Sequence, residues 1–376
     1  MKRHVRRWLG RGLWITLSLA FGLRRLIGGR RAPPDEPKLL LIVRFDLMGD
    51  VVNALSAALA ARERWPHAHL AFMTPTAWQP IVRRCPAVDE VIPFDGGAVT
   101  HWPAALNPRV WASAAAAVRS VRRRRFDVAI SVYGPIAGGV VGLSGARWRV
   151  GYRAEAPRWS FDEALPGRRH NGGPHEAELA TRLIRHADPA WQTVEPDIES
   201  DSAADLPRPL VVLHPGAAHG EAKLWPDAHW ATLAQALEPE VGTLAAVGLT
   251  DARPTADRMA ESAAIRDLTG RTSLDELTGV LAAADVVVST DSGPGHLARA
   301  LGRPVVMLHG PTDIAVHGPG DPASRALRVD LPCGPCYNFD RPAECRFGDV
   351  LCMRWLSPRR VREAVLEVMA SPKRGA

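Results

Sequence analysis

Acidic residues are missing from the first 31 positions of this 376-residue chain, where nine lysines or arginines occur. The whole chain carries a formal net charge of +7, so removing these nine positive charges leaves about −2 on residues 32–376. The body of the protein is therefore nearly neutral. Because a nucleic-acid groove needs a basic stripe on the body itself, nucleic acid is not expected among the partners.

The same segment has too few consecutive apolar residues to span a bilayer. The run Gly12–Leu23 is apolar apart from two hydroxyl residues, whereas a spanning helix needs roughly 20 residues. Arginines flank this run, which favours a helix lying on an anionic membrane surface through residues 1–31. A disordered leader and a cleaved signal peptide are the alternatives, although Arg24 and Arg25 stand where a signal peptide needs small residues.

Cysteine is scarce, and four of the five cysteines lie within 20 residues of one another. Their spacing is C-x2-C-x8-C-x6-C, which permits a structural zinc or iron site or a group of reduced thiols. A catalytic metal is not expected, because four thiolates would leave no open coordination position. The four candidate ligands are Cys333, Cys336, Cys345 and Cys352.

Short β-branched and aliphatic runs alternate with helical patterns along the first half of the chain. This alternation predicts a parallel, doubly wound sheet. The expected strands cover residues 38–44, 69–73, 91–94, 127–132 and 150–152, and a helix is expected over residues 110–121. The strand at 150–152 is expected to be the last in this half. A helix over residues 175–186 and a Pro- and acid-rich connection follow.

A second α/β series begins at Leu210. Its expected strands cover residues 210–214, 242–247, 285–290 and 304–308, and its expected helices cover 227–237, 256–262, 274–284 and 359–369. The sequence thus predicts an arm and linker (residues 1–37) and two Rossmann-like domains (38–200 and 201–376). Ligands of such sheets bind beyond the carboxyl ends of the strands, so the loops at those ends are the candidate site.

The first such loop runs from Arg44 to Asp50 and ends at the start of a helix. Asp50 suits two roles. It can cap the helix, or it can act as a general base if it faces a cleft between the two domains. Asp46 competes with Asp50 for either role.

The second loop, HPGAAHGEAKLWP at residues 214–226, again follows a strand and precedes a helix. Its small residues let backbone amides approach an anion, and Lys223 adds a positive point charge. A surface turn with a solvated lysine is the alternative.

The third loop, DSGPGH at residues 291–296, joins a buried strand to a helix. Free amides and the positive end of the helix dipole favour an anion there. The amides of Ser292, Gly293 and Gly295 are the expected donors, and His296 falls in the first helical turn. The location predicts a phosphorylated ligand near Asp291.

Taken together and in this order, the loops resemble glycosyltransferase family 9, the bacterial heptosyltransferases of lipopolysaccharide core assembly. The resemblance covers about residues 38–370. It rests on RFDLMGDVV (44–52), HPGAAHGEAKLWP (214–226), DSGPGH (291–296) and HGPTD (309–313), with weaker support from RVGYR (149–153) and the cysteine segment (332–353).

The resemblance implies a GT-B architecture, in which the first domain binds an acceptor and the second binds a nucleotide sugar. It implies inverting, metal-independent transfer of heptose from ADP-heptose to a glycolipid, with no cofactor for catalysis. It makes Asp50 the general base and places Lys223 on the phosphates of the nucleotide sugar. The implied donor-binding turn is Asp291, Ser292, Gly293 and His296, with Asp251 as the candidate for the ribose.

Other functions remain open. The protein could use another nucleotide sugar or another acceptor, or it could be a nucleotide-sugar epimerase of similar architecture or a non-catalytic binding protein. The basic arm and the glycolipid acceptor together predict a cytoplasmic protein held at the inner face of the inner membrane.

Overall fold

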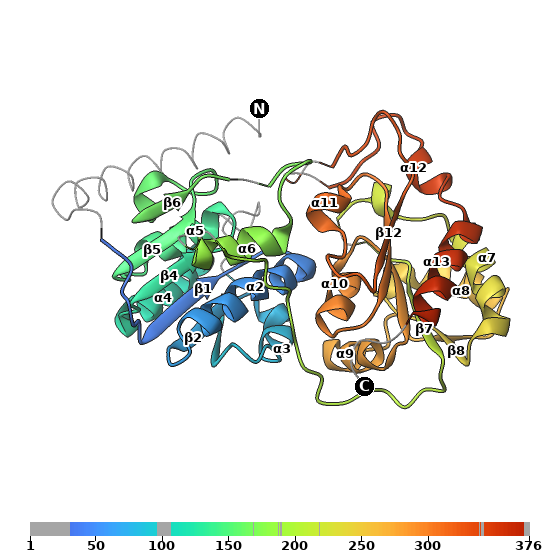
Figure 1. The fold of residues 1–376 in the computed structure, drawn as a ribbon, viewed down its shortest axis with the longest axis horizontal. Coiled ribbons are helices and arrows are strands. Elements are labelled where there is room, and N and C mark those ends of the chain that lie inside the picture. Colours follow the sequence, from blue (N-terminus) through green and yellow to red (C-terminus); the bar gives the residue numbers. More distant parts are fainter. Residues whose placement is uncertain are drawn as a thin grey trace.

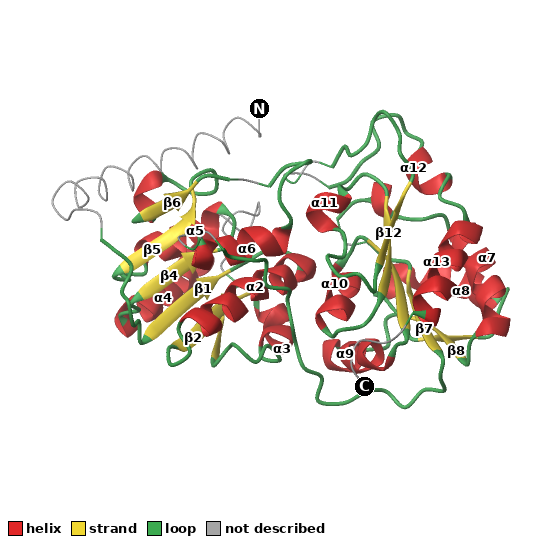
Figure 2. Ribbon diagram, in the orientation of Figure 1, coloured by secondary structure: helices red, strands yellow, loops and turns green. Residues whose placement is uncertain are grey.

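The computed structural model describes residues 31–95 and 107–371, except positions 168, 187, 189, 218, 338, 340 and 341. Within these residues the chain forms two α/β lobes that lie side by side (Figure 1; Figure 2). Each lobe contains one six-stranded sheet. The basic arm lies almost entirely outside the described residues, so the prediction of a membrane-surface helix is not addressed by the structure.

The first sheet has the strand order β3-β2-β1-β4-β5-β6, and every neighbouring pair is parallel. Its strands are β1 (Leu39–Val43), β2 (His69–Thr74), β3 (Glu90–Pro93), β4 (Val128–Ser131), β5 (Trp148–Tyr152) and β6 (Glu163–Leu165). The helices around it are α2 (Met48–Arg64), α3 (Gln79–Val82), α4 (Pro108–Arg124), α5 (Pro135–Leu143) and α6 (Glu176–Arg185).

The second sheet has the order β12-β11-β10-β7-β8-β9 and is also parallel throughout. Its strands are β7 (Leu210–His214), β8 (Thr243–Ala246), β9 (Ile265–Asp267), β10 (Val286–Thr290), β11 (Val305–His309) and β12 (Arg325–Arg328). Its helices are α7 (Asp227–Leu237), α8 (Arg253–Ala260), α9 (Leu274–Ala283), α10 (Gly293–Ala300), α11 (Ile314–His317), α12 (Leu351–Arg354) and α13 (Pro358–Ala370).

The predicted α/β class is confirmed, and the predicted strands and helices fall within a few residues of the observed ones. One prediction is wrong: β5 does not end the first sheet, because β6 pairs with it in parallel from Glu163 to Leu165. The sequence also gave no prediction for the short strands β9 and β12. The strands β6, β9 and β12 are edge strands and are only partly buried. They therefore lack the apolar runs by which central parallel strands are recognised.

The two lobes meet through helices α2 and α10, which lie at the boundary in Figure 1. Arg299 on α10 donates a 2.5 Å hydrogen bond to the side chain of Asn53 on α2, and both residues are buried. Residues 186–209 then connect the lobes, and Ile198 and Glu199 bond to backbone carbonyls of Ala300 and Arg84, one in each lobe. The proposed domain boundary at residue 200 falls in this connection.

Among the described residues, no helix is both long enough and apolar enough to cross a membrane.

Candidate active site

Asp50 lies in the first turn of α2, directly beyond the carboxyl end of the central strand β1. Its Oδ2 accepts a 3.2 Å hydrogen bond from the Leu47 amide. Leu47 is the N-cap of the helix, so Asp50 occupies the third helical position and closes the first turn from within. The other oxygen, Oδ1, accepts a 2.6 Å hydrogen bond from Nη2 of Arg169. Asp50 therefore caps the helix with Oδ2, and its Oδ1 contacts Arg169 and Arg44.

Asp50 belongs to a buried cluster of two arginines and three carboxylates. Arg44 contacts Asp46 at 2.8 Å and Asp50 at 3.1 Å, and Arg169 also pairs with Glu176. The side chains of Arg44, Arg169 and Glu176 are 2%, 8% and 3% exposed. Burial on this scale is tolerable for charges only because each one has partners of opposite sign.

The cluster divides its carboxylates into two kinds. Burial alone would raise the pKa of Asp50, but the guanidinium groups of Arg169 and Arg44 outweigh burial and hold that pKa well below its ordinary value. Burial dominates at Asp46 and Glu176 and raises both of their pKa values. The pKa of Asp50 is thus the one that the arginines lower, which keeps Asp50 in the ionised form that a general base requires.

On the other lobe, Asp291 follows β10 and pairs with two cationic or potentially cationic side chains. Its Oδ2 lies 3.1 Å from Nζ of Lys223, and its Oδ1 lies 3.2 Å from Nε2 of His296. The Lys223 ammonium also donates to the carbonyl of Asp291 at 3.2 Å. Although burial opposes ionisation, Lys223 and His296 hold the pKa of Asp291 well below its ordinary value. The second and third predicted loops therefore meet at one carboxylate.

A buried histidine, His214, fixes the turn that carries Asp291 and His296. Nδ1 of His214 lies 3.0 Å from the Ser292 hydroxyl and 3.3 Å from the Ser289 hydroxyl. Burial lowers the pKa of His214 to about 4, so the ring is neutral near pH 7. The Ser292 side chain thus helps to fix the turn, and the Gly295 amide is also engaged within it, since it donates to the Ser292 carbonyl at 3.1 Å. Binding of the donor by this turn stays a prediction.

The site has two halves, the Asp50 cluster of the first lobe and the 291–296 turn of the second. These half-sites touch across the boundary between the lobes. A Cβ atom at Gly49 would lie 2.7 Å from Cδ2 of His296, and one at Gly293 would lie 2.3 Å from the end of Met48. A side chain at Gly49 would press on the His296 ring, whereas one at Gly293 would displace the flexible end of Met48. Asp50 lies close enough to this lobe for His317 and His296 to contribute to the lowering of its pKa.

Several residues of the site were not predicted from the sequence. Arg169 and Glu176 come from the loop before α6 and its first turn, and Tyr133 stacks beneath both Arg169 (4.3 Å) and Arg44 (4.9 Å). From the other lobe, the ring of Tyr337 lies 4.7 Å from Nζ of Lys223. No local motif marks them, because only the fold brings them together.

Two further sequence predictions concern Asp251 and the four clustered cysteines. Asp251 is exposed on the turn after β8, and within the described part of the chain its side chain forms no hydrogen bond or ion pair. No set of three or more Cys, His, Asp or Glu side chains in the described residues has a metal-binding arrangement. The four clustered cysteines are free thiols. The arrangement therefore gives the zinc or iron prediction no support.

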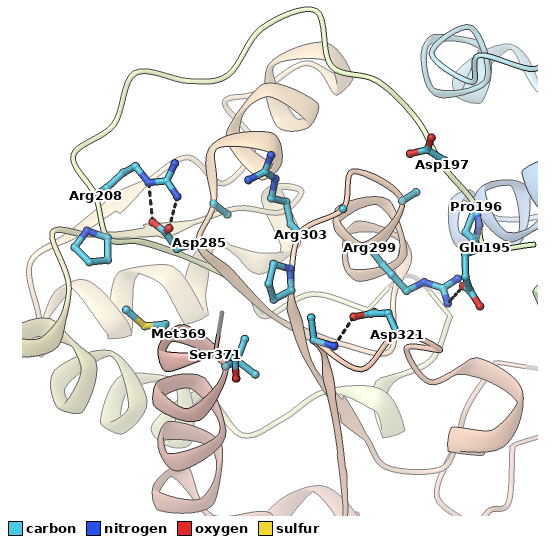
Figure 3. Close-up of a pocket in the computed structure, with 17 residues that line it drawn as sticks. Glu195, Pro196, Asp197, Arg208, Asp285, Arg299, Arg303, Asp321, Met369 and Ser371 are labelled. Carbon is cyan, nitrogen blue, oxygen red and sulfur yellow. Dashed lines mark hydrogen bonds and ion pairs between the residues drawn. The ribbon is translucent and has the colours of Figure 1, made fainter. Parts of the chain in front are cut away.

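A separate cavity of about 560 Å³ lies at the other end of the second sheet, beside the amino ends of the strands β7, β10 and β11 (Figure 3). It lies beneath the interdomain connection, and the pairs Arg208–Asp285 and Arg299–Glu195 border it. Because it opens at the edge away from Asp50 and Asp291, it is no part of the candidate site.

The fold and the site together define a two-domain glycosyltransferase of the GT-B architecture. Comparison with known proteins agrees: the model of glycosyltransferase family 9 (heptosyltransferase) matches residues 114–346, more than half of the chain. The chain therefore belongs to glycosyltransferase family 9.

Individual relatives cover nearly the whole molecule. The chain is 26% identical to lipopolysaccharide heptosyltransferase 2 of Escherichia coli K12, over 86% of this chain and 96% of that protein. The structure of E. coli ADP-heptose lipopolysaccharide heptosyltransferase II matches with a TM-score of 0.70 at 23% identity, covering 88% of this chain and 98% of that one. E. coli heptosyltransferase WaaC with ADP-2-deoxy-2-fluoro heptose matches with a TM-score of 0.68 at 23% identity, covering 88% and 99%.

Proposed function

We propose that this glycosyltransferase moves a heptose from ADP-heptose to a glycolipid of the lipopolysaccharide-core type, with inversion at the anomeric carbon. The names of the relatives support the sugar and the acceptor. The observation that supports the mechanism is the close approach of Gly49 to His296, because it brings the start of the helix that carries Asp50 against the turn whose Asp291 pairs with His296 and Lys223.

The second lobe must stabilise the leaving group of the reaction. When a sugar leaves a diphosphate, negative charge grows on the phosphate and positive charge grows at the anomeric carbon. Lys223 and the amides of Ser292 and Gly293 at the start of α10 are placed to stabilise the phosphate charge. Lys223 pairs with Asp291, so binding of a diphosphate exchanges one anionic partner for another.

Asp50 acts on the acceptor, which is the second reactant. An acceptor hydroxyl must attack from the face opposite the diphosphate, and Asp50 takes its proton as the new bond forms. The guanidinium of Arg169 keeps Asp50 ionised but also weakens it as a base. We infer that the Asp50–Arg169 bond lengthens when the acceptor binds, which would raise the pKa of Asp50 toward a value better suited to proton transfer.

The decisive experiment incubates the full chain with ADP-heptose and a heptose-free core glycolipid, and follows both ADP and the glycolipid product. The proposal predicts equal amounts of ADP and product, with the inverted anomer in the product. Isomerised sugar formed without acceptor would instead identify an epimerase, and binding without turnover would identify a binding protein.

The nucleotide of the donor is proposed from the names of the relatives, because Asp251, the proposed ribose contact, is exposed and pairs with no described side chain. The identity of the nucleotide is therefore best tested by a thermal-shift screen of nucleotide sugars, since a tight ligand stabilises the folded state by mass action. ADP-heptose is the expected best ligand.

The structural zinc or iron site at the four cysteines stays a prediction. Metal analysis of the purified full chain tests it: about one zinc or iron per chain, lost in Cys333→Ser, would support it. Metal-free protein of unchanged thermal stability would contradict it.

A further inference from the structure

The segment between Cys333 and Cys345 has no role in the mechanism above, yet its first part lies between the two half-sites. The amides of Cys336 and Tyr337 both donate to the Pro311 carbonyl at 2.9 Å, which fixes the segment to the second lobe. From the first lobe, the Asn171 side chain donates to the carbonyls of Pro335 (3.2 Å) and Tyr337 (3.1 Å). Contacts from both lobes thus hold Tyr337 at the boundary.

The ring of Tyr337 connects the two groups that the reaction uses. Its face covers the Lys223 ammonium at 4.7 Å, and its edge meets Phe339 at a centroid distance of 5.1 Å. Phe339 in turn lies 5.2 Å from the guanidinium of Arg169, the partner of Asp50. A continuous aromatic contact therefore runs from the phosphate-binding lysine to the arginine that holds the base.

The charges around Tyr337 agree with this position. Burial comes first in raising the pKa of its phenol, and the carboxylates of Asp50 and Asp291 raise it further from the two lobes. The hydroxyl therefore stays protonated and can donate a hydrogen bond. The side chain is only partly buried, so part of its surface remains available to a ligand.

An inverting transfer requires the sugar to lie between the base and the diphosphate, and Tyr337 lies beside that space. A tyrosine offers an apolar ring face and a hydroxyl, which match the C–H face and the hydroxyl groups of a sugar. We propose that Tyr337 contacts the transferred sugar directly and determines which sugar the enzyme accepts. This inference rests on the proposed function, since it names the residue that recognises the sugar at that same site.

The test separates recognition of the sugar from recognition of the nucleotide. Calorimetry measures the affinities of ADP and ADP-heptose for the wild type, Tyr337→Phe and Tyr337→Ala. We expect Tyr337→Ala to bind ADP as the wild type does, but to lose at least about tenfold in the ratio of ADP-heptose to ADP affinity. Tyr337→Phe keeps the ring, so its ratio of ADP-heptose to ADP affinity should fall by less than that of Tyr337→Ala. Phe347→Ala is the matched control, because Phe347 is an aromatic residue just beyond Cys345 that is 67% exposed.

An unchanged affinity ratio in Tyr337→Ala would overturn the inference. If the ratio is unchanged because ADP and ADP-heptose lose affinity equally, Tyr337 acts only through Lys223, and if neither affinity changes, Tyr337 takes no part in binding. Failure of the proposed function is distinct, because the wild type itself would then form no glycolipid product from ADP-heptose.

Discussion

At the scale of single residues, the site depends on charges that are buried and paired. Asp50 and Asp291 are ionised because arginine in one case and lysine in the other compensate for their burial. Both carboxylates follow apolar strand runs and could be predicted from the sequence. Their partner Arg169 could not, because it lies 119 residues from Asp50 in a Gly- and Pro-rich stretch without periodicity.

The first prediction concerns the pH dependence of the reaction. Arg169 is the strongest influence that lowers the pKa of Asp50. In Arg169→Met we expect this pKa to rise by about 1–3 units. The acidic limb of kcat/KM, which lies below the ordinary aspartate range in the wild type, therefore moves to higher pH. A pH–rate profile measures the shift.

Arg149→Met provides the control, because Arg149 pairs with Asp162 in the same sheet and does not contact the site. An acidic limb that stays in place in Arg169→Met would show that Arg169 does not govern Asp50.

The second prediction concerns Lys223. Its ammonium lies 3.1 Å from Asp291 and faces the start of α10. Lys223→Ala should weaken binding of ADP-heptose by about 10- to 100-fold, because a charge-assisted contact to phosphate is lost. Calorimetry reads the change. Lys223→Arg retains the charge and should recover part of the affinity, and equal binding by all three proteins would exclude Lys223 from the phosphate site.

At the scale of elements, short turns after central strands bring the site together. The strands β1, β7 and β10 are buried along nearly their whole length, and this is why their positions and the following loops could be predicted. Helix α9 begins in the same recognisable way, with a capping box formed by Ser273 as the N-cap and Glu276. The aromatic contact of Tyr337 could not be predicted, because it depends on how a segment without regular structure folds between the lobes.

The third prediction tests the contact between the first turn of α2 and helix α10. Gly49→Ala places a methyl group 2.7 Å from the His296 ring, which should cost about 1–3 kcal/mol of stability. In the His296→Ala background the same change should cost less, because the ring is gone. Thermal or urea unfolding of the four proteins gives the coupling energy. A coupling energy of zero would mean that the two residues do not touch.

At the scale of the whole molecule, two similar sheets place their carboxyl-end loops against each other. The buried apolar cluster extends from residues of β1 and α2 to residues of β10 and α10 without interruption. A continuous apolar boundary of this kind restrains the relative motion of the two lobes. The α/β class and the two-domain arrangement follow from sequence alternation alone, whereas the strand order and the edge strands do not.

The fourth prediction concerns the basic arm, which lies outside the described residues. Its nine lysines and arginines should bind the full chain to anionic vesicles, and removal of residues 2–31 should release it. Co-sedimentation with anionic and with neutral vesicles measures the effect. Retention of the shortened chain on anionic vesicles would place the membrane contact on the globular body.

The central claim is that Asp50 removes the proton of the acceptor while the second lobe holds the nucleotide sugar. Asp50→Asn tests it most directly, because it keeps the size of the side chain and removes the base. We predict that the rate of heptose transfer falls by about 10²–10⁴-fold, while calorimetry shows ADP-heptose affinity within about tenfold of the wild type. Near-normal transfer by Asp50→Asn would contradict the mechanism.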